Sequence, residues 1–117
     1  MENDLDIIRQ LENQIGKKLE QKTLGRITRF DSQGYVLDGD NFVIGLNLYS
    51  CKIADLIFLS KLFRLTHLQL GKNKISDVSQ LQGLTALKTL RLSSKKLARS
   101  GIKNVSLLGL LQDKIKS

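Results

Sequence analysis

The chain of 117 residues is long enough for one domain of ordinary size and too short for a second independent core. It lacks Trp and Pro, has only two Tyr and four Phe, and is rich in Leu, which favours thin repeated layers over one globular centre. The net charge of +8 is uneven: residues 1–58 hold seven Lys and Arg against nine Asp and Glu, and residues 59–117 hold twelve against two. A basic half favours acidic partners by long-range attraction, although basic runs are also common on solvated surfaces.

Neither a leader nor a membrane span is expected from the sequence. Residues 1–6 are acidic and run into no apolar stretch of the kind that a signal peptide needs. No apolar run approaches the ~20 residues that cross a bilayer. The lone cysteine, Cys51, has no partner for an internal disulfide, which agrees with a reducing compartment. We therefore expect a cytoplasmic protein.

The first predicted element is an amphipathic helix. Apolar residues recur near the start at steps of three and four, which places them on one helical face. Asn3 or Asp4 can cap its N-terminus, and Gly16 can end it. The apolar series comprises Leu5, Ile8, Leu11, Ile15 and Leu19.

A β-hairpin is expected after this helix. Two β-rich runs, residues 27–30 and 35–38, are separated by turn residues and lead into a strand at residues 42–48. Asp38 and Asp40 could be imagined as calcium ligands. No Glu stands at the twelfth position of such a loop, so a plain turn is the better interpretation.

A pattern with a period of 22 residues follows. Its central copy, residues 65–75, reads L-x-x-L-x-L-x-x-N-x-I. The alternation L-x-L predicts a short strand whose leucines point inward, and successive copies should stack into a parallel sheet because one copy cannot bury its own apolar side. The equivalent positions one period earlier are Val43, Leu46, Leu48, Cys51 and Ile53, and one period later Leu87, Leu90, Leu92, Lys95 and Leu97.

Two positions are predicted to support the turn that follows each strand. The amide of Asn73 can bond backbone groups that a tight bend leaves unpaired, and Cys51 occupies the same position one copy earlier. With no second Cys or nearby His, Cys51 is better explained as a buried structural residue than as a reactive thiol or metal ligand. The pattern decays near residue 99, and residues 100–117 are predicted to form a Leu-rich capping helix.

These residues resemble a known family. Residues 46–56 and 68–78 resemble the 22-residue class of leucine-rich repeats found in internalins and the phosphatase-1 regulatory subunit. Residues 35–46, preceded by the amphipathic helix, are similar to the start of bacterial intracellular leucine-rich-repeat proteins, including the N-terminal region of bacterial Roco proteins. The resemblance covers roughly residues 1–98 and implies a fold more than a function, because the family binds many partners.

The chain also departs from that family in two respects. Phe58 and Gln80 stand where Pro usually precedes the convex-side leucine. No Walker-type loop is present, so the nucleotide-dependent activity of Roco proteins is not implied. The sequence thus predicts one α/β domain over residues 1–117: a helix and hairpin cap (1–42), about three repeats of a short solenoid with a parallel sheet (43–99), and the capping helix (100–117).

The function predicted from the repeats is non-catalytic binding of a protein partner. One His and one Cys offer little for catalysis, and neither a cofactor nor a metal is predicted. Outward residues on adjacent strands should line up on the concave surface, where Tyr49, His67 and Arg91 are the side chains most typical of interface anchors. The alternative is a plain solvated sheet. The predicted surface comprises Asn47, Tyr49, His67, Gln69, Thr89, Arg91 and Ser93.

Two other uses of the chain remain open. A basic flank after the strands could hold an acidic partner or the phosphates of a nucleic acid. Sequence-specific nucleic-acid binding is disfavoured because no RNP-like aromatic motif, zinc spacing or recognition helix is present. The third use is oligomerisation, with a monomer or weak homo-oligomer expected. The basic flank comprises Lys72, Lys74, Lys95, Lys96 and Arg99.

Overall fold

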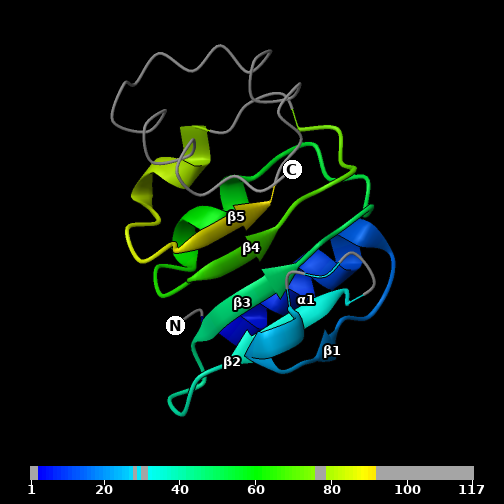
Figure 1. The fold of residues 1–117 in the computed structure, drawn as a ribbon. Coiled ribbons are helices and arrows are strands. Elements are labelled where there is room, and N and C mark those ends of the chain that lie inside the picture. Colours follow the sequence, from blue (N-terminus) through cyan, green and yellow to red (C-terminus); the bar gives the residue numbers. More distant parts are fainter. Residues whose placement is uncertain (1–2, 28, 30–31, 76–78, 92–117) are drawn as a thin grey trace.

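The computed structural model describes residues 3–27, 29, 32–75 and 79–91. This part forms one α-helix and a five-stranded sheet in which strands adjacent in sequence are adjacent in space (Figure 1). The helix is α1 (Asp4–Ile15), and the strands are β1 (Glu20–Gln21), β2 (Gly34–Leu37), β3 (Val43–Asn47), β4 (His67–Gln69) and β5 (Thr89–Arg91). Three 3-10 helices complete it: η1 (Leu24–Arg26), η2 (Ile57–Lys61) and η3 (Ser79–Gly83).

Helix α1 begins and ends where the sequence indicates. The side chain of Asn3 accepts a hydrogen bond from Asp6 N at 2.9 Å while the Asp6 carboxylate accepts one from Asn3 N at 3.1 Å, which is a capping box. Gly16 ends the helix in the left-handed region at φ +76°. The predicted apolar series ran on to Leu19, which instead lies beyond the helix and still joins the core.

The observed hairpin differs from the predicted one. Strand β2 pairs antiparallel with β3, so the hairpin turn is residues 38–42, not residues 31–34. Asp38 supports this turn because its Oδ1 accepts from Asp40 N at 2.9 Å and from Phe42 N at 3.0 Å. Of the predicted first run, residues 28 and 30 lie outside the described residues, and Ile27 follows η1 without pairing in the sheet. Strand β1, which pairs parallel with β2, was not predicted.

The 22-residue period sets the register of the parallel strands. Leu46 of β3 lies beside Leu68 of β4, and Leu68 lies beside Leu90 of β5. The 3-10 helices repeat with the same period, since η2 starts at residue 57 and η3 at residue 79. The predicted register of the repeats is therefore confirmed through β5. The part of the third repeat beyond Arg91 and the predicted helix at residues 100–117 lie outside the described residues.

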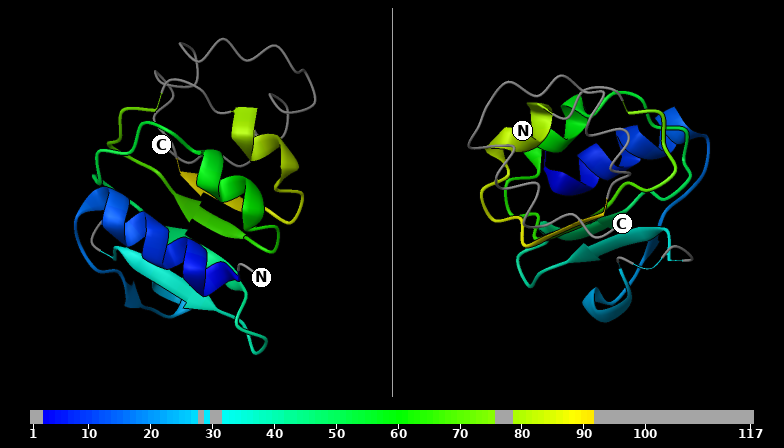
Figure 2. Two further views of the ribbon diagram at one scale, coloured as in Figure 1. Left: turned by 180° about the vertical axis from the view of Figure 1, so that it is seen from behind. Right: turned by 45° about the horizontal axis from the view of Figure 1, so that its top comes forward.

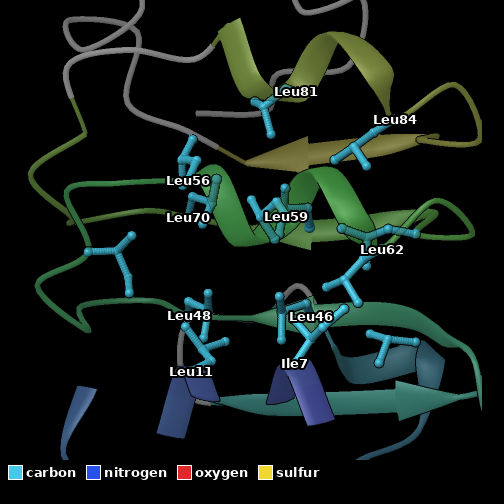
Figure 3. Packing of buried hydrophobic residues seen from close by; sticks show 14 of the residues in the cluster. Ile7, Leu11, Leu46, Leu48, Leu56, Leu59, Leu62, Leu70, Leu81 and Leu84 are labelled. Carbon is cyan, nitrogen blue, oxygen red and sulfur yellow. The ribbon is translucent and has the colours of Figure 1, made fainter. Parts of the chain in front are cut away.

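The core lies between the sheet and the helices on one of its faces. Ile7 and Leu11 of α1 lie against Leu46 and Leu48, and leucines of η2 and η3 continue this layer under the next strands (Figure 3). A buried carboxylate fixes α1 to the sheet, because Asp4 Oδ2 accepts from Val43 N at 2.8 Å. No helix in the described part of the chain is long and apolar enough to span a bilayer.

The opposite face of the sheet carries a second, smaller layer. In the right-hand view of Figure 2, η1 lies on the side of the sheet away from α1, η2 and η3. The residue after η1, Ile27, is fully buried there, and a Cβ on Gly45 would lie 3.2 Å from both Ile27 Cγ1 and Val36 Cγ2. Glycine at position 45 thus allows this covering segment to pack directly on β3. We call this side of the sheet the outer face.

Candidate binding surface

The register of the strands forms two rows of side chains on the outer face. Gly45, His67 and Thr89 are one row, because they pair across β3, β4 and β5. Asn47, Gln69 and Arg91 form the second row in the same way. These are the residues that alternation predicts to point away from the leucine core.

The covering segment removes Asn47 from the accessible surface. Its side chain is fully buried, its Nδ2 donates to Ile27 O at 2.6 Å and also to Arg29 O, and its Oδ1 accepts from Tyr49 N at 3.0 Å. The prediction that Asn47 contacts a partner is therefore wrong. Its amide holds the η1 segment against the sheet, because each of its polar atoms is paired with backbone.

Gln69 is also buried, so its predicted place in the contact surface is wrong as well. Only 4% of the residue is exposed, and its Oε1 accepts from Gly71 N at 2.7 Å. The ring of Tyr49 lies just beyond, since a Cβ on Gly71 would lie 3.0 Å from the Tyr49 ring. Tyr49 itself is half-buried, and its carbonyl accepts from the side chain of Gln33.

His67 is half-buried at the centre of the outer face. Thr66 Oγ1 donates to Ile44 O at 2.8 Å and lies 2.8 Å from His67 Nδ1, so its single proton is used and Nδ1 acts as the donor. Burial lowers the pKa of His67, and the charge of Lys88 lowers it further. The ring is thus neutral at physiological pH and presents Nε2 as an acceptor.

The last described strand, β5, carries one residue of each row. Thr89 and Arg91 are half-buried, whereas Leu90 between them is fully buried on the core face. The Nε atom of Arg91 is buried and has no hydrogen-bond partner among the described residues. Ser93, the remaining predicted contact residue, lies outside the described part of the chain.

The turn after β4 depends on one buried amide. Asn73 Oδ1 accepts from Cys51 N at 3.0 Å and from Ile53 N at 2.9 Å, and Asn73 Nδ2 donates to Leu48 O at 2.8 Å and to Leu70 O at 3.0 Å. Three of these four groups belong to the preceding repeat. Asn73 therefore joins two successive turns, and this explains why an amide rather than an aliphatic side chain occupies the position.

Comparison with known families fits this geometry. A family model described as leucine rich repeats, in two copies, matches residues 63–107. Residues 63–107 thus carry leucine-rich repeats. No curated protein matches the chain. The matched residues include β4, Asn73 and β5, and β4 and β5 pair in the 22-residue register.

The basic flank predicted beside these repeats is described only in part. Lys72 and Lys74 are exposed after β4. The other three members, Lys95, Lys96 and Arg99, lie outside the described residues.

The described repeats offer little for metal or thiol chemistry. Within them no group of three His, Cys, Asp or Glu side chains is placed to hold a metal ion. Cys51 is buried, which raises the pKa of its thiol, and its Sγ lies 3.6 Å from Tyr49 O. A protonated, buried thiol is a poor nucleophile. Leucine-rich repeats are typically non-catalytic and generally mediate protein–protein contacts.

Sequence reasoning missed the segment that covers the outer face. Ile27 and Arg29 were assigned to a strand because of their β propensity, and nothing in that pattern shows which face a segment will cover. The sequence held one indication of this cover. Gly45 occupies an outward-facing strand position, and the equivalent residues of the next two strands are His67 and Thr89. A strand glycine often marks the close approach of another backbone or side chain.

Proposed function

We propose that this leucine-rich-repeat chain is a non-catalytic module that binds a protein partner through the open part of its outer face. That surface consists of Tyr49, His67, Thr89 and Arg91. The observation that carries the proposal is the change in burial along the second row: Asn47 and Gln69 are buried, whereas Arg91 is only half-buried. The covering segment closes the face at β3, so a partner is expected over β4 and β5.

The remaining parts of the chain are proposed to protect the ends of a short solenoid. Helix α1 and β2 lie at the start of the repeat stack, where Ile7 and Leu11 bury the exposed side of Leu46 and Leu48. Residues 100–117 would cover the other end as a helix. In this proposal residues 1–117 are one domain that acts in the cytoplasm, where the lone thiol of Cys51 stays reduced.

A position-specific cross-linking experiment tests the contact surface. A photoreactive phenylalanine analogue is placed at Thr89 on the outer face or at Asn13, an exposed residue of α1. Irradiation in a lysate of the native cells is expected to give a discrete protein adduct from position 89 and none from position 13. The adduct should be lost when His67 and Arg91 are both replaced by Ala.

Parallel samples separate the other two uses of the chain. Nuclease treatment that abolishes the position-89 adduct would identify a partner held through nucleic acid. An adduct between two copies of the chain would instead indicate oligomerisation, which light scattering across concentration can measure. Equal adducts from positions 89 and 13 would remove the outer face as the specific contact surface.

A further inference from the structure

Arg91 on the outer face has an unpaired nitrogen among the described residues. Its Nε is buried without a hydrogen-bond partner in the described chain, and no ion pair to its guanidinium is present there. By contrast, Arg64 forms ion pairs with Asp38 Oδ2 at 3.0 Å and with Asp40 Oδ2 at 3.5 Å. Buried donors are normally paired, and because this Nε is closed to solvent, a group from outside can reach the guanidinium only at its Nη atoms.

Among the described residues, the charged side chains of the outer face are all cationic. Lys88 precedes β5 closely enough to lower the pKa of His67, and Arg26 and Arg29 are exposed on the segment that covers the same face. No described acid belongs to β3, β4, β5 or η1. The described acids all lie on α1, on β1, in the hairpin turn or before η2: Asp4, Asp6, Glu12, Glu20, Asp38, Asp40 and Asp55.

We propose that Arg91 binds a carboxylate of the protein partner, so that the partner presents an acidic segment to the outer face over β4 and β5. The two Nη atoms of a guanidinium form a planar fork that matches the two oxygens of a carboxylate. Partial burial strengthens this pairing because the local dielectric is lower than that of water. This inference rests on the proposed function, and it specifies that the partner at that surface carries carboxylates.

Binding of a fluorescent oligo-glutamate peptide, followed by anisotropy at low salt, tests this assignment. Arg91→Met keeps the length of the side chain and removes its charge, and it is expected to weaken binding about tenfold or more. Arg91→Lys keeps the charge without the fork and should fall between Arg91→Met and the native chain. The matched control Lys74→Met removes the same charge from an exposed lysine after β4 and should change affinity less than about twofold.

Three results would overturn the proposal. The first is that the native chain fails to bind the peptide, and the second is that Arg91→Met and Lys74→Met weaken binding equally, which would indicate a diffuse charge effect. The third is that an oligo-uridine RNA binds more tightly than the peptide and depends equally on Arg91, since phosphate would then be the ligand. Circular dichroism and thermal melting establish that each variant is folded.

A chemical readout tests Arg91 directly. Phenylglyoxal modifies accessible arginines, and mass spectrometry can follow the adduct at position 91 with and without the peptide. Protection of Arg91 but not of Arg9, an exposed arginine of α1, is expected. Equal modification with and without the peptide would contradict the proposal.

The outcome of the cross-linking experiment separates this inference from the proposed function. If position 89 gives a specific protein adduct that Arg91→Met leaves intact, the outer face binds a partner without a carboxylate on Arg91. If position 89 gives no adduct at all, the proposed function fails whatever the peptide does.

Discussion

The two faces of the sheet differ in how their residues repeat. On the core face, Leu46, Leu68 and Leu90 are the same residue type with the same complete burial. On the outer face, the equivalent rows hold Gly, His and Thr, and Asn, Gln and Arg, with burial that decreases towards β5. Each core leucine must occupy the same space between neighbouring repeats, whereas an outer residue meets whatever covers that strand. Periodicity therefore describes the scaffold, and departures from it describe the individual surface.

The largest expected effect comes from replacing, one at a time, two adjacent residues that lie on opposite faces of β4. Leu68→Ala removes a fully buried side chain and should lower the free energy of unfolding by about 2–5 kcal/mol. His67→Ala removes a half-buried side chain and should cost about 1 kcal/mol or less. Urea denaturation followed by circular dichroism measures both. If His67→Ala proved as destabilising as Leu68→Ala, the outer face would be a second core and could not be free for a partner.

The second-largest expected effect concerns the turns that follow β3 and β4. Asn73→Ala leaves two backbone N–H groups and three carbonyls without their side-chain partner, so a loss of about 3 kcal/mol is expected. Cys51→Ala, at the same position one repeat earlier, removes only a small buried thiol and should cost about 1 kcal/mol. Equal losses measured by denaturation would mean that the amide hydrogen bonds of Asn73 add little to the fold.

These comparisons also show what the sequence could and could not predict. The register of β3, β4 and β5 was predictable because inward leucines alternate with other residues and recur with one period. The hairpin was wrongly paired because residues 27–30 have β propensity, yet Ile27 is used to cover Gly45. Strand β1 has two exposed residues and no apolar signal, so it could not be found.

The candidate surface was predicted in outline and wrong in detail. Alternation correctly placed the row of Asn47, Gln69 and Arg91 away from the leucine core. It could not show that Ile27 O and Arg29 O take up the amide of Asn47, because that contact spans 18 to 20 residues and follows from tertiary packing. The same limit applies to the unpaired Nε of Arg91, which is visible only once its neighbours are placed.

A third prediction tests whether the covering segment is packed on β3. Gly45→Ala would place a methyl group 3.2 Å from Ile27 Cγ1 and Val36 Cγ2, and this overpacking should cost about 1–2 kcal/mol. Gly39→Ala is the matched control, since nothing lies within 4 Å of a Cβ there. Ile27→Ala in the same chain should relieve part of the clash, with a coupling of about 1 kcal/mol in a double-mutant cycle. Additive effects would mean that the outer face is open at β3 as well.

The smallest expected effect concerns Asp4 of α1. It is the one charged residue among the buried residues of the described chain, and it lies on the core side of the sheet. Its burial raises the pKa above the ordinary 3.8, although the hydrogen bond from Val43 N and the charge of Arg64 oppose the shift. A raised pKa means that the folded chain binds this proton more tightly than the unfolded chain does. The resulting stability is fully present below pH 3.8 and is lost as the pH rises through the folded pKa.

Asp4→Asn keeps an oxygen that can accept from Val43 N and removes the ionisation. The free energy of unfolding of the native chain, relative to that of Asp4→Asn, should therefore fall as the pH is raised from about 3 to 7. Asp38 titrates in the opposite sense, because backbone hydrogen bonds, above all from Phe42 N, lower its pKa. Asp38 is present in both proteins, so the difference between their denaturation curves reports the ionisation of Asp4 together with its charge coupling to Asp38. A difference that does not change with pH would show that α1 packs on β3 without desolvating this carboxylate. The core face would then be less completely closed at β3 than at β4.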